Sequence, residues 1–170
     1  MKILLIGILS IVLPVFAQHK HENHTKHAEV KRQVLPSKDR FVLLEVLAMN
    51  DLLFNSFLKK DQGLIEKNAK ELSVLLASTD STIVKLVKGK TSILNGIKSS
   101  NKNEDNLKAY ESFLNPLLAL VQQYDVGGKY NIFSCPMVKK SWIQDLKTNK
   151  DVRNVFAIDM LECGSQDTHF

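Results

Sequence analysis

The chain has 170 residues, of which 24% are charged and 44% are hydrophobic, and its formal net charge is +5 at pH 7. Its lysines are scattered among acidic residues with few aromatic residues between them. This pattern is typical of a solvated surface, so we expect no nucleic-acid partner. Both cysteines and all five histidines lie towards the two ends of the chain. Thiol and imidazole chemistry is therefore expected there and not in the long middle segment.

Residues 1–17 have the composition of a signal peptide. A positively charged start precedes the apolar run 3–13, and Val15 and Ala17 place small side chains at the −3 and −1 positions for cleavage. The run is shorter than the about 20 residues that a membrane-spanning helix needs. A retained N-terminal anchor is the alternative. We expect a periplasmic or secreted chain that begins near Gln18, lacks a stable membrane span after cleavage and forms one domain with a core.

Residues 18–36 are polar and charged with little to bury, and they are predicted to form a flexible tail. The tail contains four closely spaced histidines, namely His19, His21, His24 and His27. Imidazole is a ligand for Cu(II), Zn and Ni, and a flexible tract would bind such ions loosely because the chain must be ordered on binding. A solvated tail with no specific ion is the alternative. His169, the fifth histidine, is expected to be exposed and has a weaker claim as a ligand.

Residues 37–126 are predicted to form an up-down four-helix bundle, so the fold class is expected to be mainly α. Apolar residues recur at intervals of three and four in four segments, which are separated by polar breaks at 61–63, 78–81 and 99–105. The clearest stripe consists of Leu107, Tyr110, Leu114, Leu117, Val121 and Tyr124. The first segment has more apolar residues than one face needs. This excess indicates either a deeply buried helix or a face that binds a partner.

Residues 127–170 are predicted to form a small Cys- and Met-containing C-terminal appendage that packs on one end of the bundle. The helical periodicity stops at a Gly-Gly pair. Residues 130–133 have the character of a short strand or an extended segment, and residues 139–150 could contain a turn or a hairpin. We expect the bundle and the appendage to share one globular domain over residues 37–164.

Sulfur-containing side chains are concentrated in this appendage, in the segments Cys135-Pro136-Met137 and Met160-Leu161-Glu162-Cys163. Side chains two residues apart in an extended segment point to the same side, and side chains three apart are neighbours on a helical turn. If the chain between the two segments folds back, four soft donors would meet: Cys135, Met137, Met160 and Cys163. Thiolate and thioether donors favour Cu(I) or Ag(I) over hard cations. For each methionine, filling of the core is the alternative role.

The main alternative to this metal site is a disulfide between Cys135 and Cys163, which an exported location would favour. It would enclose about 28 residues and contribute about 3.5 kcal/mol in the chain-entropy description. A bridge that can be reduced would reconcile the two interpretations, because reduction releases both thiols. Buried unpaired thiols and thiol exchange remain as further alternatives. The sequence contains no phosphate-binding loop, nucleophile elbow or metalloprotease motif, so we expect a protein that is not an enzyme.

The C-terminal segments resemble a bacterial family of exported domains of unknown function, which also occurs at the C-terminus of some periplasmic adaptors of copper and silver efflux pumps. That family combines a helical region with aromatic-x-Cys-Pro-Met, a Trp, Asn-Pro-Tyr-Phe-Gly and Met-Leu-x-Cys-Gly. The corresponding segments are Phe133-Ser134-Cys135-Pro136-Met137, Trp142, Asn154-Val155-Phe156-Ala157 and Met160-Leu161-Glu162-Cys163-Gly164. The resemblance covers roughly residues 37–164. Asn154 is not followed by Pro-Tyr, and Ser134 stands where the family often has a histidine, so the imidazole ligand is missing here.

This resemblance implies a periplasmic role in handling copper or silver. We therefore expect an exported protein that binds and transfers such an ion without turnover, with the four sulfur donors as the specific site and the histidine tail as a collector of ions. An efflux-system protein or another envelope protein is the expected partner. The alternative function is a disulfide-stapled helical interaction module of the cell envelope with no metal role, and thiol exchange is a weaker third.

Overall fold

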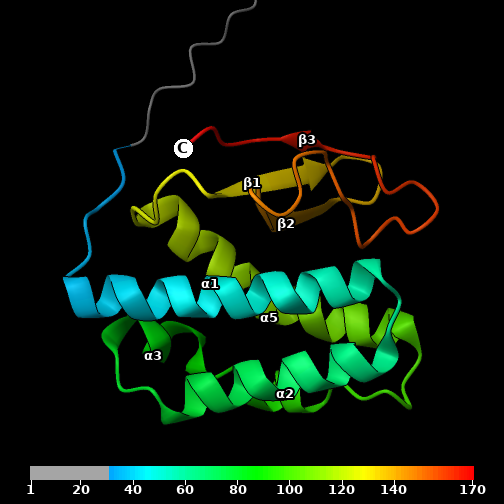
Figure 1. The fold of residues 1–170 in the computed structure, drawn as a ribbon, viewed down its shortest axis with the longest axis horizontal. Helices are drawn as coiled ribbons and strands as arrows, with labels where there is room; N and C mark the ends of the chain where they lie inside the picture. The colour runs from blue at the N-terminus through cyan, green and yellow to red at the C-terminus, as the bar shows by residue number, and fades with distance from the viewer. Residues whose placement is uncertain (1–30) are drawn as a thin grey trace, which may run out of the picture. The chain divides into compact units, whose positions relative to one another are not determined.

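Five helices and three short strands form residues 31–170, the part of the chain that the computed structural model describes (Figure 1). The predicted signal peptide of residues 1–17 lies outside the described residues. So do the four clustered histidines of the predicted tail, His19, His21, His24 and His27. Within the described residues, the segment ahead of the first helix already makes contacts, because Leu35 is buried and Gln33 forms a parallel bridge with Tyr124.

The fold is mainly helical, but the predicted up-down four-helix bundle is wrong. The helices are α1 (Ser37–Leu58), α2 (Gln62–Ser78), α3 (Thr82–Lys88), α4 (Thr91–Asn95) and α5 (Asn103–Gln123). The strands are β1 (Tyr130–Cys135), β2 (Lys140–Asp145) and β3 (Ser165–Gln166). Two differences from the prediction account for this: one predicted helix is divided into two short ones, and a sheet packs against the helices.

The third predicted helix is divided at Gly89 and Lys90. Gly89 ends α3, and Lys90 precedes the first turn of α4. Lys90 is the one polar residue in the apolar stripe of this segment, so the interruption of the stripe coincides with the break. Because the chain turns there, α3 buries Val84 and Val87 while α4 buries Leu94 separately.

The helix α1 is apolar on more than one face because it has neighbours on more than one side. It packs against α2 and α3 and also against β2 (Figure 1). By length and composition it is apolar enough to cross a membrane, yet 50% of that apolar window is buried within the fold. The interpretation as a deeply buried helix therefore holds for about half of this window. Phe41 and Leu52 are the exceptions, with 63% and 50% of their surface exposed.

The C-terminal region forms an antiparallel sheet with strand order β2-β1-β3. β1 and β2 are a hairpin in which Phe133 pairs with Trp142, and β3 pairs with the other edge of β1 through Ser134 and Ser165. Trp142 and Ile143 are buried in the same hydrophobic core as the helices. The sheet lies alongside α1 and α5 and is in contact with both (Figure 1). It is therefore a layer of the domain that completes the core.

Candidate disulfide and soft-metal site

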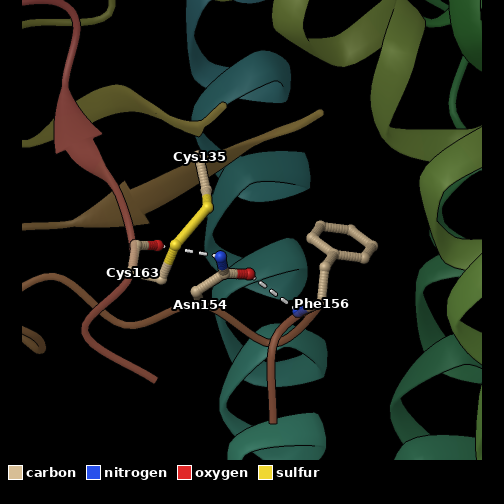
Figure 2. The surroundings of a disulfide bond; sticks show 4 residues. All are labelled: Cys135, Asn154, Phe156 and Cys163. Carbon is tan, nitrogen blue, oxygen red and sulfur yellow. Dashed lines mark hydrogen bonds between the residues drawn. A yellow bond between two sulfur atoms is a disulfide. The ribbon is translucent and has the colours of Figure 1, made fainter. Parts of the chain in front are cut away.

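Cys135 and Cys163 are joined by a disulfide, which confirms the predicted pairing (Figure 2). Their Cα atoms are 5.9 Å apart, although 28 residues separate them in sequence. Cys135 is the last residue of β1 and is buried, whereas Cys163 is partly exposed in the segment that leads to β3. Both cysteines take part in this bond, so residues 31–170 contain no free thiol. The bond is compatible with an oxidising, exported compartment.

Backbone pairing brings the Cys163 segment to β1. Ser134, which precedes Cys135, pairs with Ser165, two residues beyond Cys163. Gly164, between Cys163 and Ser165, has a φ of 143°, a conformation that is strained for any residue with a side chain. A Cβ atom on Gly164 would lie 2.7 Å from the Trp142 ring and 2.8 Å from the Ser134 carbonyl oxygen. Glycine is therefore required for the close approach that aligns the two cysteines.

Asn154 organises the loop that leads to Cys163 (Figure 2). Its Nδ2 donates to the carbonyl oxygen of Cys163 at 2.9 Å, and its Oδ1 accepts from the backbone N–H of Phe156 at 2.9 Å. Its own backbone N–H donates to the carbonyl oxygen of Leu161 at 2.7 Å. The side chain is fully buried, so these bonds satisfy polar groups that water does not reach.

Aromatic stacking fastens the same loop to the helical core. The ring of Phe156 stacks on Tyr110 of α5, with centroids 6.1 Å apart and planes 15° apart. Tyr110 also lies 5.2 Å from the ring of Phe57 on α1, and its hydroxyl donates to Asn50 Oδ1 at 3.0 Å. Burial raises the pKa of Tyr110. The loop that carries one cysteine is thus held against Tyr110 of α5, which in turn packs against α1.

Both methionines of the predicted soft site are exposed, so neither fills the core. Met137 lies in the turn between β1 and β2 and is 69% exposed, and Met160 is 46% exposed. Cys163 and Met160 belong to one tight turn, because the N–H of Cys163 donates to the carbonyl oxygen of Met160 at 2.9 Å. The structure brings the two cysteines together. It leaves a solvent-accessible thioether two residues from Cys135, at Met137, and another three residues from Cys163, at Met160.

Of the other predicted ligands, only His169 belongs to the described residues. His169 is exposed near the end of the C-terminal segment. The four tail histidines are not among the described residues. In the region covering residues 31–170, no group of three or more His, Cys, Asp or Glu side chains is arranged to hold a metal ion. A soft site at this position would therefore consist of the two cysteines with one or both thioethers.

A pair of carboxylates at the boundary between α1 and β2, one buried and one partly buried, was missed by sequence reasoning. Asp145 is buried and forms an ion pair of 2.8 Å with Lys129. Asp51 of α1 lies near it, and its Oδ1 is buried without a hydrogen-bond partner. Burial, and secondarily the negative charge of Asp145, raises the pKa of Asp51 to about 6. The available signal was the polar pair Asn50-Asp51 inside the apolar run of the first helix.

No family model, curated protein or solved structure matches this chain. The resemblance of its C-terminal segments to the exported family therefore stays a prediction. The functional argument rests on the geometry of residues 31–170, in which the disulfide and the two exposed thioethers are the chemically reactive features.

Proposed function

We propose that this protein is an exported carrier of Cu(I) or Ag(I) that binds the ion in its dithiol form and transfers it without turnover. Cys135 and Cys163 would be the thiolate ligands, and Met137 and Met160 would add thioether sulfur. The proposal is supported chiefly by the pairing of two cysteines that are distant in sequence, each with an exposed methionine two or three residues away along the chain. Soft donors of this kind favour Cu(I) and Ag(I) over hard cations.

The disulfide is the form of the proposed site that does not bind the ion. The metal ligand is the thiolate, and both cysteine sulfurs are tied up while the bridge is intact. A dithiol reductant would open it: two electrons and two protons convert the bridge to two thiols, and the reductant becomes a disulfide. The ion then replaces the thiol protons, so binding releases protons to solvent. In the reverse step the two thiolates would pass two electrons to the disulfide form of that reductant, which takes up two protons to become a dithiol; the S–S bond would re-form and the ion would be released.

The exposed thioethers give the proposed site an entrance. Cys135 is buried, whereas Cys163 is partly exposed and Met137 and Met160 are exposed, so an ion arriving from solvent would first meet one of these three sulfurs. The thioether of methionine is a neutral donor, so it would bind the ion weakly enough to release it to a partner. We infer that the partner is an envelope or efflux-system protein with soft donors of its own. The histidine tail would raise the local concentration of ions.

Competition for Cu(I) tests this proposal. The reduced full-length mature chain and its Cys135→Ser variant are titrated anaerobically against a chromophoric Cu(I) chelator. We expect the variant to lose at least about 100-fold in affinity, because one of two charged soft donors is removed. The tail is the same in both proteins and cancels from the comparison.

Methionine variants provide the matched control. Met137→Leu and Met160→Leu should each weaken Cu(I) binding by a smaller factor, whereas Met49→Leu on α1, which is remote in sequence from the cysteines, should not change it. Equal competition by wild type and Cys135→Ser would overturn the proposal.

A stapled interaction module with no metal role is the second candidate. The observation that favours it is the exposed apolar surface of α1, where Phe41 and Leu52 are 63% and 50% exposed. Surface residues of this size are often contacts for a partner when they gather in a patch. If the cysteines prove irrelevant to Cu(I), the disulfide would serve to hold the sheet layer in place.

A further inference from the structure

We propose that Asn154 is a positioning residue that keeps Cys163 opposite Cys135 after the disulfide is reduced. The loop from Asn154 to Cys163 would then hold its shape in the dithiol form, and the bridge would open and close without refolding. Where metal binding is concerned, this inference rests on the proposed function, and it adds the residue on which reversibility depends.

The first argument is that the bonds of Asn154 do not involve sulfur. Its side-chain amide donates to the carbonyl oxygen of Cys163 and accepts from the N–H of Phe156, both at 2.9 Å (Figure 2). Its backbone N–H closes the loop on the carbonyl oxygen of Leu161 at 2.7 Å. Reduction of the bridge therefore leaves this set of hydrogen bonds in place.

The second argument is that the loop cannot leave without exposing buried groups. Asn154 and Val155 are both fully buried, and Phe156 is stacked on the buried Tyr110. Movement of the loop would break the Asn154 bonds and remove apolar surface from the core, which opposes opening. On the far side of Cys163, the pairing of Ser165 with Ser134 restrains the chain in the same way.

The third argument concerns Cys135, whose position is independent of the loop. It is the last residue of β1, opposite Lys140 in the hairpin. Lys140 in turn forms an ion pair of 2.6 Å with Glu111 of α5. One thiol is therefore held by the hairpin and the other by Asn154. Such preorganisation raises the effective concentration of one thiol at the other and lowers the ordering cost of metal binding.

Amide hydrogen exchange of the full mature chain tests the inference without any metal. The reporters are the backbone amides of residue 154 and of Cys163, which bond to Leu161 and Met160 and not to the Asn154 side chain. In the reduced wild type we expect both amides to stay protected to within about threefold of the oxidised protein. Loss of their protection on reduction of the wild type would overturn the proposal.

The variant Asn154→Ala provides the second arm. In its reduced form the two reporter amides should exchange at least about tenfold faster than in reduced wild type, because two hydrogen bonds of a buried side chain are lost. In its oxidised form the bridge should preserve most of their protection. The same variant should shift the equilibrium with a glutathione buffer towards the dithiol by about tenfold. Unchanged reporters and an unchanged equilibrium would contradict the assigned role.

Asn106→Ala is the matched control. Asn106 is also a fully buried asparagine, and its Nδ2 donates to the carbonyl oxygen of Lys98 at 2.8 Å, in the segment between α4 and α5. This variant should lower global stability while leaving the ratio of oxidised to reduced exchange rates at the reporters unchanged. A change as large as that of Asn154→Ala would show that the reporters follow general destabilisation, and the inference would fail.

Cu(I) titration of the same proteins separates this inference from the proposed function. Reduced Asn154→Ala should bind Cu(I) about tenfold more weakly than wild type, because the ligands must first be ordered. If wild type and Cys135→Ser bind alike, the proposed function fails, whereas the exchange results still decide whether Asn154 positions the thiol. If Cys135 matters and Asn154→Ala binds as wild type does, the positioning role is wrong.

Discussion

At the scale of single residues, the carboxyl group of Asp51 lies in an environment that disfavours its charged form. Its Oδ1 is buried without a hydrogen-bond partner, and Asp145 adds a second negative charge nearby. The charged form is therefore disfavoured, and the pKa of Asp51 rises to about 6. Lys129 Nζ lies 2.8 Å from Asp145 Oδ2. Lys129 therefore offsets the charge of Asp145 more than it offsets the charge of Asp51.

This environment predicts that Asp51 lowers stability as pH rises. A carboxyl whose pKa is higher in the folded state binds its proton more tightly there, so the folded state is favoured at acid pH and loses that advantage between about pH 4 and 7. Asp51→Asn, which resembles the protonated form, should be more stable than wild type by about 1–2 kcal/mol at pH 7.5 and nearly equal to it at about pH 3.5, below the pKa of the unfolded chain. Urea unfolding at the two pH values measures the difference.

The exposed Asp159 provides the control. Asp159→Asn should show the same difference in unfolding free energy between the two pH values as wild type does. If Asp51→Asn is less stable than wild type at pH 7.5, the ionised carboxylate is stabilising and the burial argument is wrong. Sequence reasoning did not find this pair because burial of a carboxyl depends on the packing of β2 against α1, which no local pattern encodes.

At the scale of elements, the junction between β1 and β3 depends on one glycine. Gly164 has φ 143°, and a Cβ there would lie 2.8 Å from the Ser134 carbonyl oxygen, a backbone atom that cannot rotate away. Gly164→Ala should therefore destabilise the fold by about 2–3 kcal/mol through strain and displacement of β3. Thermal or urea unfolding of the oxidised protein measures this loss.

The matched control is Gly89→Ala, because nothing lies within 4 Å of the Cβ position at Gly89 and its φ of −61° suits any residue. That variant should be neutral or more stable by up to about 1 kcal/mol. Equal effects of the two substitutions would show that the close approach at Gly164 does not constrain the fold.

The element boundaries show what local patterns can predict. The long helices α1, α2 and α5 follow from the spacing of apolar residues at three and four. In the hairpin region, residues 130–133 were expected as a short strand or extended segment and residues 139–150 as a turn or a hairpin. β3 was not predicted at all. It has only two residues, Ser165 and Gln166, and exists because β1 offers an edge for pairing. A strand of this kind has no periodicity of its own to detect.

At the scale of the whole molecule, the predicted bundle fails because the sheet takes part in the core. Trp142 and Phe133 are buried with the helical residues, and Phe156 reaches Tyr110 on α5. The excess of apolar residues on α1 was the signal for this second layer, but it does not distinguish a sheet from a partner. The disulfide was predicted as one of several alternatives for the two cysteines, and its pairing is observed.

The same view of the molecule relates the disulfide to the proposed site. A core shared by helices and sheet keeps the hairpin and the loop of Asn154 in place, so the two cysteines meet at a position set by the fold and not only by their own bond. The exposure of Met137 and Met160 was not predictable, because their spacing fits core filling as well as ligation.

The central claim is that the opened disulfide binds a soft ion through sulfur, and X-ray absorption spectroscopy tests it most directly. The reduced full mature chain is loaded with one equivalent of Cu(I), alongside a Cys135→Ser/Cys163→Ser variant with an intact tail. We expect a sulfur-dominated first shell in the wild type and its replacement by nitrogen or oxygen donors in the variant. The same nitrogen-based shell in both proteins would contradict the account.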